Sequence, residues 1–595
     1  MQSALTLSTP PLTHLLYRLW AHINSRRRAQ LSFLLLLVVF ASFAEVVSLG
    51  AVVPFLGVLA EPSRVFTLPL LQPLIVGFRL VEPSQLLLPI SVSFALLAVV
   101  SNAIRLVLLW AQTRLGHALG ADFSMQIYRN TLYQPYAVHA SRNSSDIIAS
   151  ISARAHQVVQ CILLPSLTLF SSTFILLSIL AGMIVIDPLV AIVSFAGFGT
   201  IYGIILAVTK RQISINGAII SEKSGQVLKA LQEGLGGIRD ILLDGTQQVY
   251  CEIYREADFS SRRAMAHNHI VGMAPRYLVE GLGMCMMVAL AFYMVSGSEG
   301  IIATVPTLGA LALAAQRMLP TLQLGYGSLV QIKGSDILLA EILGLLDQPL
   351  PAHARLPSPV PNRFEERISL QNISFRYGAD LPWVLRDISF DIPKGARIGF
   401  IGKTGSGKST LLDVIMGLIE PENGRLLIDG VPITDENRRA WQVHLAHVPQ
   451  MIFLADTTIA ENIAFGVPLT KINMQLVREC AHRACISEKI ESMPKQYATH
   501  VGERGVRLSG GQRQRIAIAR ALYKKADVIV FDEATSALDH ETERDVMEAI
   551  ENFGDNITTL IVAHRLTTLE KCSQIVELSD GVIKRVASYE QVVSY

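Results

Sequence analysis

Six apolar segments, each long enough to cross the hydrocarbon core of a bilayer, constrain the fold of this chain more than any other feature. A membrane-spanning helix needs roughly 20 consecutive, mostly apolar residues. The segments run from about Leu31 to Leu59, Leu86 to Thr113, Ile162 to Ile186, Pro188 to Val208, Ile270 to Val295 and Ile301 to Leu322. They predict an α-helical membrane domain of six transmembrane helices.

Basic residues predict the orientation of this domain. Arg18, Arg26, Arg27 and Arg28 precede the first segment without any acidic residue, and the positive-inside rule keeps such a terminus in the cytoplasm. Six crossings then return the chain to the cytoplasm. We therefore expect a multi-pass protein of the inner (cytoplasmic) membrane, in contact with the lipid bilayer, with long cytoplasmic extensions of its helices.

Composition indicates a second, soluble domain. Hydrophobic residues make up 51% of the 595 residues and charged residues only 17%, against about a quarter charged in soluble proteins. The apolar excess is confined to the first half. We predict a transmembrane domain at 1–345, a proline-rich linker at 346–366 and a soluble α/β domain at 367–595.

Charge and cysteine content exclude two classes of function. The formal net charge is +2, and no Lys/Arg block after residue 30 resembles a nucleic-acid patch, so we expect no nucleic-acid partner. The six cysteines are scattered, with no CxxC or zinc-like spacing. They predict reduced thiols rather than a metal site or disulfides.

A glycine-rich loop in the soluble half predicts a phosphate-binding site. The apolar strand Arg397 to Ile401 leads into the pattern GxxxxGK[ST], and an apolar helix follows, which is the context that a phosphate-binding loop requires. Its backbone N–H groups, the helix N-terminus and Lys408 would hold the phosphates, and the Ser409 hydroxyl would bind Mg²⁺. The predicted nucleotide-binding residues here are Gly402, Lys403, Thr404, Gly405, Ser406, Gly407, Lys408, Ser409 and Thr410.

Two adjacent carboxylates predict the hydrolytic half of this site. The buried-strand run Val528 to Phe531 ends in Asp532 and Glu533. Asp532 is suited to hold Mg²⁺, and Glu533 to orient or deprotonate the attacking water. Together with the loop, they predict a nucleotide hydrolase.

The soluble domain resembles the ATP-binding cassette family. "LSGGQ", Leu508 to Gln512, followed by "RQRIAIARAL" is similar to the signature of that family. The resemblance implies a P-loop cassette that binds ATP and Mg²⁺, with nucleotide contacts from Ser509, Gly510, Gly511 and Gln512. It also implies that Tyr377 stacks on adenine, Gln450 touches Mg²⁺, His564 senses the γ-phosphate and Asp539 joins two ATP sites.

Six helices before one cassette resemble a half-size exporter. One phosphate loop and one signature per chain imply that a complete site needs two chains, so we expect a homodimer; a heterodimer stays open. The resemblance implies an ATPase coupled to transport by alternating access. Coupling helices would lie around Ser141 to Ala153 and Gly236 to Gln247.

Ionisable residues inside the predicted spans point to the substrate. They are Glu45, Arg105, Arg276, Glu280 and Arg317, and such residues usually face a cavity or a partner. Internal pairing is one alternative, with Glu45 or Glu280 bound to an arginine. We expect Arg317, whose neighbours Gln316 and Met318 offer no anion, to contact an anionic substrate with help from Arg276, Arg105 and Glu45.

Segments of the first and sixth spans suggest a subfamily. "FAEVVSLGAVVPFLGVLA" and "QRMLPTL" resemble the lipid-linked oligosaccharide flippase of bacterial N-glycosylation and related polysaccharide exporters. This implies a polyprenyl-pyrophosphate-linked glycan, or another amphipathic anionic substrate. A general lipid or multidrug exporter is the main alternative, and an ATP-gated channel or regulator is less favoured because Glu533 and His564 are both present.

Overall fold

The computed structural model describes residues 11–60, 62–66, 81–142, 147–148, 151, 154–186, 188–295, 300–351, 354, 360–533, 548, 556–563 and 565–594. Its contacts divide the chain into two units. The first contains residues 1–134 and 142–350, and the second contains residues 135–141 and 351–595. Each unit has its own architecture.

The first unit is helical. Its elements are α1 (Leu12–Ala21), α2 (Ser25–Gly50), α3 (Val52–Ala60), α4 (Pro62–Phe66), the 3₁₀ turn η2 (Pro83–Leu86), α6 (Leu87–Leu132), α9 (Ala155–Val158), the π-helical turn η4 (Val159–Leu163), α10 (Leu164–Ile186), α11 (Pro188–Gly236), α12 (Ile238–Asp244), α13 (Gln247–Val295), α14 (Gly300–Lys333) and α15 (Asp336–Leu346). The last three predicted segments fall within α11, α13 and α14. The first spans α2 and α3, and the second and third begin in η2 and η4 and continue in α6 and α10.

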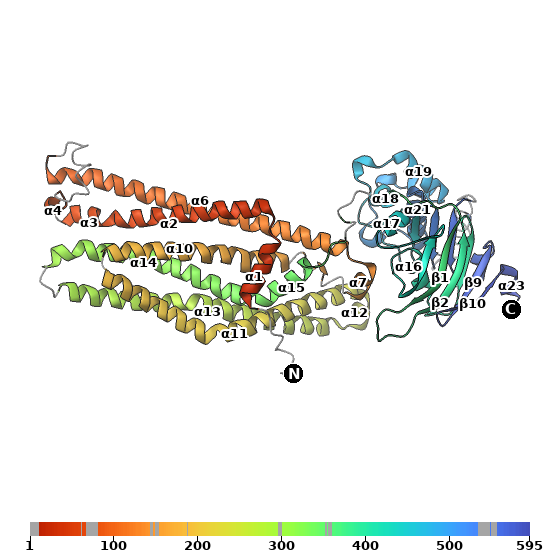
Figure 1. Cartoon of the computed structure of the whole chain (residues 1–595), viewed down its shortest axis with the longest axis horizontal. Helices are drawn as coiled ribbons and strands as arrows, with labels where there is room; N and C mark the ends of the chain where they lie inside the picture. The colour runs from red at the N-terminus through yellow and green to blue at the C-terminus, as the bar shows by residue number, and fades with distance from the viewer. Residues whose placement is uncertain are drawn as a thin grey trace. The chain divides into compact units, whose positions relative to one another are not determined.

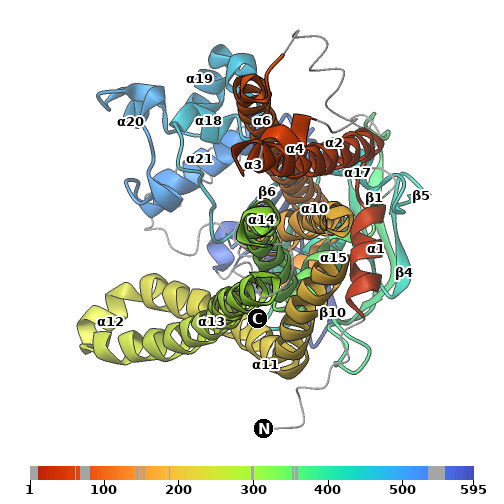
Figure 2. The same ribbon diagram turned by 90° about the vertical axis from the view of Figure 1, so that its left-hand side faces the viewer.

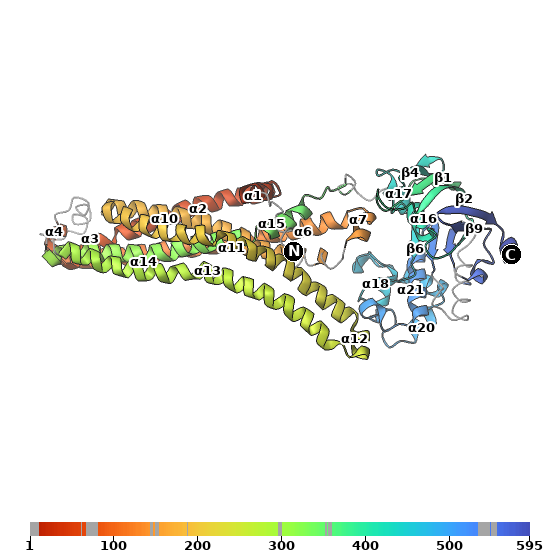
Figure 3. The ribbon, with the colours of Figure 1, turned by 90° about the horizontal axis from the view of Figure 1, so that it is seen from below.

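Three antiparallel helix pairs build this unit. α2 lies against α6, α10 against α14, and α11 against α13. Figure 2 looks along the bundle and shows α2 with α6 on one side, α10 with α14 in the middle, and α11 with α13 on the other side. In Figure 3, α11 and α13 run side by side to α12, which lies within the predicted coupling segment Gly236 to Gln247.

Three helical stretches among the described residues are long and apolar enough to cross a membrane: Ser25–Leu59, Pro83–Leu132 and Ala155–Val185. They contain the first three predicted spans. The other three lie within α11, α13 and α14, whose apolar parts include side chains outside the described set. Many large apolar side chains on the long helices of the first unit are exposed, such as Phe43 on α2, Leu106 on α6 and Phe292 on α13. A surface that faces lipid requires such side chains.

The second unit is an α/β domain with two sheets. Its strands are β1 (Arg367–Phe375), β2 (Leu385–Pro393), β3 (Arg397–Ile401), β4 (Asn423–Ile428), β5 (Val431–Pro432), β6 (Leu445–Val448), β7 (Val528–Asp532), β8 (Thr558–Val562), β9 (Gln574–Ser579) and β10 (Val582–Ala587). Its helices are α7 (Tyr136–Ser141), α16 (Lys408–Ile415), α17 (Arg438–Gln442), α18 (Ile459–Ile463), α19 (Met474–Arg483), α20 (Ser487–Glu491), α21 (Gly510–Tyr523) and α23 (Tyr589–Val593).

Strand order places the functional loops of this unit at one edge. The antiparallel sheet has the order β2-β1-β4-β5, and the larger sheet has the order β10-β9-β3-β8-β7-β6. From β9 to β6 the strands are parallel. β3, β7 and β8 are buried almost throughout, as expected for central parallel strands covered on both faces. Their carboxyl ends meet at the same edge, where the predicted nucleotide residues follow.

Candidate functional site

The predicted phosphate loop connects β3 to α16 as the sequence indicates. Lys408 begins α16, is 6% exposed, and its Nζ donates to the carbonyl oxygens of Gly402 at 2.9 Å and Lys403 at 3.1 Å. The loop is therefore wrapped around a buried ammonium group. An ammonium ion held only by neutral carbonyls is well placed to bind an anion such as a phosphate.

Glycine is required at two positions of this loop. Gly402 and Gly407 have φ angles of 151° and 98°, which residues other than glycine rarely adopt. A Cβ at Gly402 would approach the Leu578 carbonyl oxygen to 2.3 Å, and one at Gly407 would approach the Val384 carbonyl oxygen to 2.9 Å. Ser406 Oγ is buried without a hydrogen-bond partner among the described atoms. The loop thus fits a phosphate that would satisfy this hydroxyl.

Carboxylates gather beside the loop. Asp532 ends β7. Burial raises its pKa, and the neighbouring Glu533 charge adds to the shift, while His447, Ser409 and Lys408 oppose it. Burial, together with the Asp532 charge, raises the pKa of Asp413 to about 6. Carboxylates whose pKa is raised by burial and by one another's charge fit a divalent cation.

Asp413 was not among the residues predicted from the sequence. It lies on α16, four residues after Ser409, and therefore on the same face of the helix. That spacing is the signal that could have identified it. Among the described residues no three His, Cys, Asp or Glu side chains form a metal cluster.

Gln450 and Glu533 are brought together. Gln450 Nε2 donates to Glu533 Oε2 at 2.8 Å, which leaves the Gln450 carbonyl oxygen for a cation. Glu533 has a φ of 49°, and its N–H donates to the Val562 carbonyl at 3.1 Å. A non-glycine residue held in the left-handed region is strained, and such strain is common at functional sites. The carboxylate is thus held beside Gln450, directly after β7.

Tyr377 lies at the same loop. Its hydroxyl is 3.2 Å from Thr410 Oγ1, its ring meets Phe375 edge-on at 5.0 Å, and the residue is 52% exposed. The ring is therefore both anchored and available for stacking on a base. His564 and Asp539, predicted from the family resemblance, lie outside the described residues.

The signature residues cap a helix. Ser509 Oγ accepts from the Gln512 N–H at 3.3 Å, and Gln512 Oε1 accepts from the Ser509 N–H at 3.1 Å. This capping box begins α21 and leaves Gly510 exposed at the helix N-terminus. A phosphate at this point would meet backbone N–H groups and the positive end of the helix dipole.

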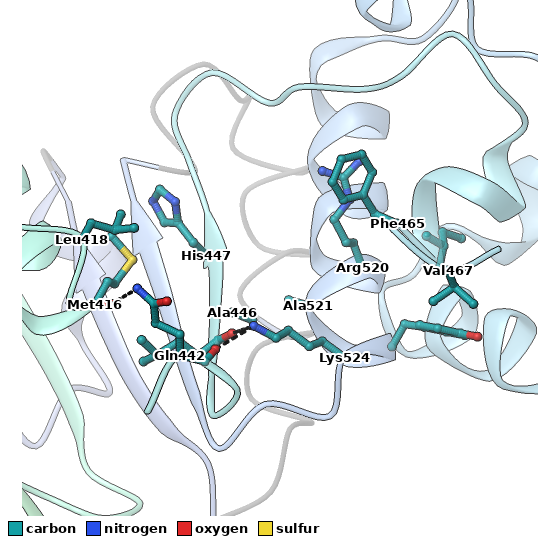
Figure 4. Close-up of a pocket in the computed structure, with 13 residues that line it drawn as sticks. Met416, Leu418, Gln442, Ala446, His447, Phe465, Val467, Arg520, Ala521 and Lys524 are labelled. Atoms are coloured by element: carbon teal, nitrogen blue, oxygen red, sulfur yellow. Dashed lines mark hydrogen bonds between the residues drawn. The ribbon is translucent and has the colours of Figure 1, made fainter. Parts of the chain in front are cut away.

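A cavity of about 660 Å³ lies between β6, α18 and α21 (Figure 4). The Arg520 guanidinium lies 4.6 Å from the centroid of the Phe465 ring. Lys524 Nζ donates to the carbonyls of Gln442, at 2.9 Å, and Leu445. The lining is mostly apolar, and Phe465 is 53% exposed, so the cavity suits an apolar segment of protein.

Three of the four predicted substrate residues form one cluster in the membrane unit. Glu45 on α2 is 1% exposed, and its Oε1 accepts from Arg317 on α14 at 2.8 Å. Arg105 on α6 lies 3.7 Å from the same oxygen, and Ser101 Oγ donates to Glu45 Oε2 at 3.2 Å. Arg317 also donates to Ser48 Oγ at 3.3 Å. One carboxylate thus faces two guanidinium groups.

The reason for singling out Arg317 was wrong in one respect. Its neighbours along the chain offer no anion, but Glu45 reaches it from a different helix. Internal pairing, the alternative considered from the sequence, is what the structure shows. Arg276, the fourth residue, is apart from the cluster and donates to Glu280, one turn along α13, at 2.9 Å. Whether these arginines touch a substrate stays a prediction.

Comparison with known proteins covers both units. The model of the ABC transporter family matches residues 385–536, and that of the ABC transporter transmembrane region matches residues 31–314. The ATP-dependent lipid A-core flippase of Chromohalobacter salexigens is 34% identical over 406 residues, 67% of this chain and 68% of the relative. That of Alkalilimnicola ehrlichii is 28% identical over 81% of both chains.

A solved structure shares the fold. The structure of a bacterial Atm1-family ABC exporter with ATP bound superposes with a TM-score of 0.76 and covers 96% of this chain and 97% of its own, at 21% sequence identity. The helical unit followed by an α/β unit is therefore a known arrangement.

Proposed function

Because the chain belongs to the ABC transporter family, with the transmembrane region and cassette of a half-size exporter, we propose that it moves an anionic, glycan-bearing lipid across the inner membrane. The exporter fold and the ATPase cassette follow from the comparisons. The relatives named lipid A-core flippases support a lipid as the transported substrate. A polyprenyl-pyrophosphate-linked oligosaccharide is the more specific candidate.

The observation that carries the anionic substrate is the charge of the spans. The six predicted spans contain three arginines (Arg105, Arg276 and Arg317) against two glutamates (Glu45 and Glu280), an excess of one positive charge (3 − 2 = +1). In the described residues, Glu45 is the one carboxylate that pairs with either Arg105 or Arg317. An unbalanced charge within a bilayer is costly unless it meets water or an anion, and pyrophosphate is an anion that guanidinium binds well.

In the cassette, we propose that the phosphate loop holds ATP and that Ser409, Asp532 and the Gln450 carbonyl oxygen hold Mg²⁺. Bound Mg²⁺ would neutralise charge on the phosphates. Glu533 would accept the proton of the attacking water, and its hydrogen bond to Gln450 keeps it oriented. Ser509, Gly510 and Gly511 of a second chain would complete the site, so the active form would be a dimer, with the cassettes and N-terminus in the cytoplasm.

We further propose that a coupling helix transmits closure of the cassettes to the membrane helices. α12 exposes Leu242 and Leu243, which are 61% and 77% exposed, an apolar surface that such a helix would present to a partner.

The proposed function is tested with purified protein in liposomes. Polyprenyl pyrophosphate carrying a short oligosaccharide should stimulate ATP hydrolysis and become accessible on the opposite leaflet when ATP is supplied. Lipid A-core and an uncharged drug-like amphipath are the comparison substrates. If the drug-like amphipath stimulates and moves while neither anionic lipid does, the chain is a multidrug exporter.

A further inference from the structure

A second cavity lies inside the membrane unit, with a volume of about 390 Å³, within the range of about 300–1,000 Å³ usual for small-molecule sites. Its walls come from α9, η4, α11, α13, α14 and α15. Cys161 precedes the predicted span that starts at Ile162, Ser221 follows the span that ends at Val208, and His269 directly precedes the span that starts at Ile270. The cavity therefore lies at the cytoplasmic ends of the spans.

Backbone packing shapes this cavity. A Cβ at Gly217 on α11 would approach the Gly334 carbonyl oxygen to 2.4 Å, so α11 lies directly against the break between α14 and α15. On α14, a Cβ at Gly327 would meet no atom within 4 Å. The absent side chain at Gly327 thus leaves space in the cavity wall. The π-helical turn η4, which contains Cys161, forms another wall of the cavity. Such turns often occur at functional sites.

Polar side chains in the wall lack partners. Gln157 and Ser224, which are half-buried, and His269 and Gln331, which are exposed, line the cavity, and none has a side-chain hydrogen bond to the part of the chain that the structure describes. Amide, hydroxyl and neutral imidazole groups both donate and accept hydrogen bonds. A ligand that satisfied all four would also have to donate and accept.

Charge in the wall is balanced. Arg154 is the one Lys, Arg, Asp or Glu among the described lining residues, and its NH1 lies 3.2 Å from Glu341, which also accepts from Ser221 at 2.7 Å. An ionised phosphate accepts hydrogen bonds but does not donate them, and it binds best to cationic side chains that have no carboxylate partner. This wall therefore suits an uncharged ligand, in contrast to the cluster of Arg105, Glu45 and Arg317.

We infer that this cavity binds a sugar of the transported lipid, an inference that rests on the proposed function. Sugar hydroxyls both donate and accept hydrogen bonds, so they are complementary to these four side chains. The C–H faces of a sugar ring would contact Met265, Met273 and Val330, which also line the cavity. The cavity would select the glycan, and the cluster of Arg105, Glu45 and Arg317 would bind the pyrophosphate that links the glycan to the lipid.

Direct binding tests the inference. Three radiolabelled probes are measured on the full-length protein in lipid nanodiscs: polyprenyl pyrophosphate carrying a short neutral oligosaccharide, the same lipid without sugar, and an alkyl glucoside. Gly327→Leu, which fills the cavity, and Gln331→Leu, which removes an amide, should each weaken binding of both sugar-bearing probes by about tenfold, the effect of one or two lost hydrogen bonds. Binding of the sugar-free lipid should be unchanged.

The matched control is Gly203→Leu. Gly203 lies on α11, a Cβ there also meets no atom within 4 Å, and it does not line the cavity. It should bind all three probes like the wild type. Equal losses for the sugar-bearing and sugar-free lipids in Gly327→Leu and Gln331→Leu, or no loss in either, would overturn the inference.

The probes also separate the inference from the proposed function. If the glucoside binds and Gly327→Leu blocks it, but the lipid-linked glycan does not bind, the cavity is a sugar site and the proposed substrate is wrong. If the lipid-linked glycan is bound and moved by wild type and by both variants alike, the proposed function stands and the sugar site does not.

Discussion

Removing the carboxylate of Glu45 should destabilise the membrane unit severely. The residue is 1% exposed and holds Arg317 at 2.8 Å and Ser101 at 3.2 Å, with Arg105 at 3.7 Å. Glu45→Gln keeps the size of the side chain but leaves two guanidinium groups facing each other without an anion. Removing one partner of a buried ion pair costs about 3–5 kcal/mol, and here two cations lose the same partner.

A matched control lies in the same unit. Asp258 and Arg262 form an ion pair on α13, at 2.7 Å, that lies outside the six predicted spans, with side chains 26% and 73% exposed, and ion pairs exposed to water contribute little to stability. Asp258→Asn should therefore change the midpoint of thermal unfolding in detergent little, whereas Glu45→Gln should lower it by several degrees. Near-equal midpoints for the two variants would refute the importance assigned to burial.

A double variant isolates the pair. Glu45→Gln with Arg317→Gln removes both charges, so it should be more stable than Glu45→Gln alone, since buried pairs can often be replaced together at little cost. Arg317→Lys should keep a positive charge opposite Glu45 and most of the stability, while losing the planar fork that we propose to bind pyrophosphate. If the double variant is as unstable as the sum of the single variants, Arg317 is not the partner that Glu45 neutralises.

Three further predictions concern the cassette. Glu533→Gln should bind ATP but lose about 10²–10⁴-fold in turnover, the usual cost of losing a general base; near-normal hydrolysis in a steady-state assay would remove the assigned role. Asp413→Asn should stabilise the nucleotide-free protein by on the order of 1 kcal/mol above pH 6. In the folded protein the pKa of Asp413 is raised to about 6, so the Asp413 carboxylate destabilises the fold increasingly as pH rises from about 4 to 6. If Asp413→Asn shifts the unfolding midpoint equally at pH 4 and pH 7, the raised pKa is not the cause of the stabilisation. Mixing Lys408→Ala chains with Ser509→Arg chains should restore hydrolysis, because each mixed dimer contains one site with a normal loop and a normal signature; no recovery would show that the two motifs act within one chain.

The strand, loop and helix around the predicted phosphate site could be predicted because this motif is local. The strand, loop and helix that position Lys408 are consecutive in sequence, and the structure has them at β3 and α16. The same holds for Asp532, at the end of β7. The raised pKa of Asp413 could not be predicted in the same way, because it depends on burial and on how α16 packs beside β7.

The membrane cluster shows the opposite case. Glu45 and Arg317 are 272 residues apart in sequence, and neither has a charged neighbour along its own helix to signal the contact. Sequence hydropathy placed both in spans, which established that each needs a partner, but the identity of the partner depends on how α2 and α14 pack together. The cavity at Gly327 was equally hidden, since its polar groups come from separate helices.

Arg317 keeps N–H donors for a further partner after it pairs with Glu45. A guanidinium group has five N–H donors, and the described contacts use NH1 for Glu45 and NH2 for Ser48. Because Arg105 and Arg317 share a single carboxylate, an arriving pyrophosphate would meet one unneutralised positive charge without breaking the buried pair. A fixed Glu45 would then hold Arg317 in place for the substrate, so the contact that stabilises the helices would also order the group that we propose to bind the anion.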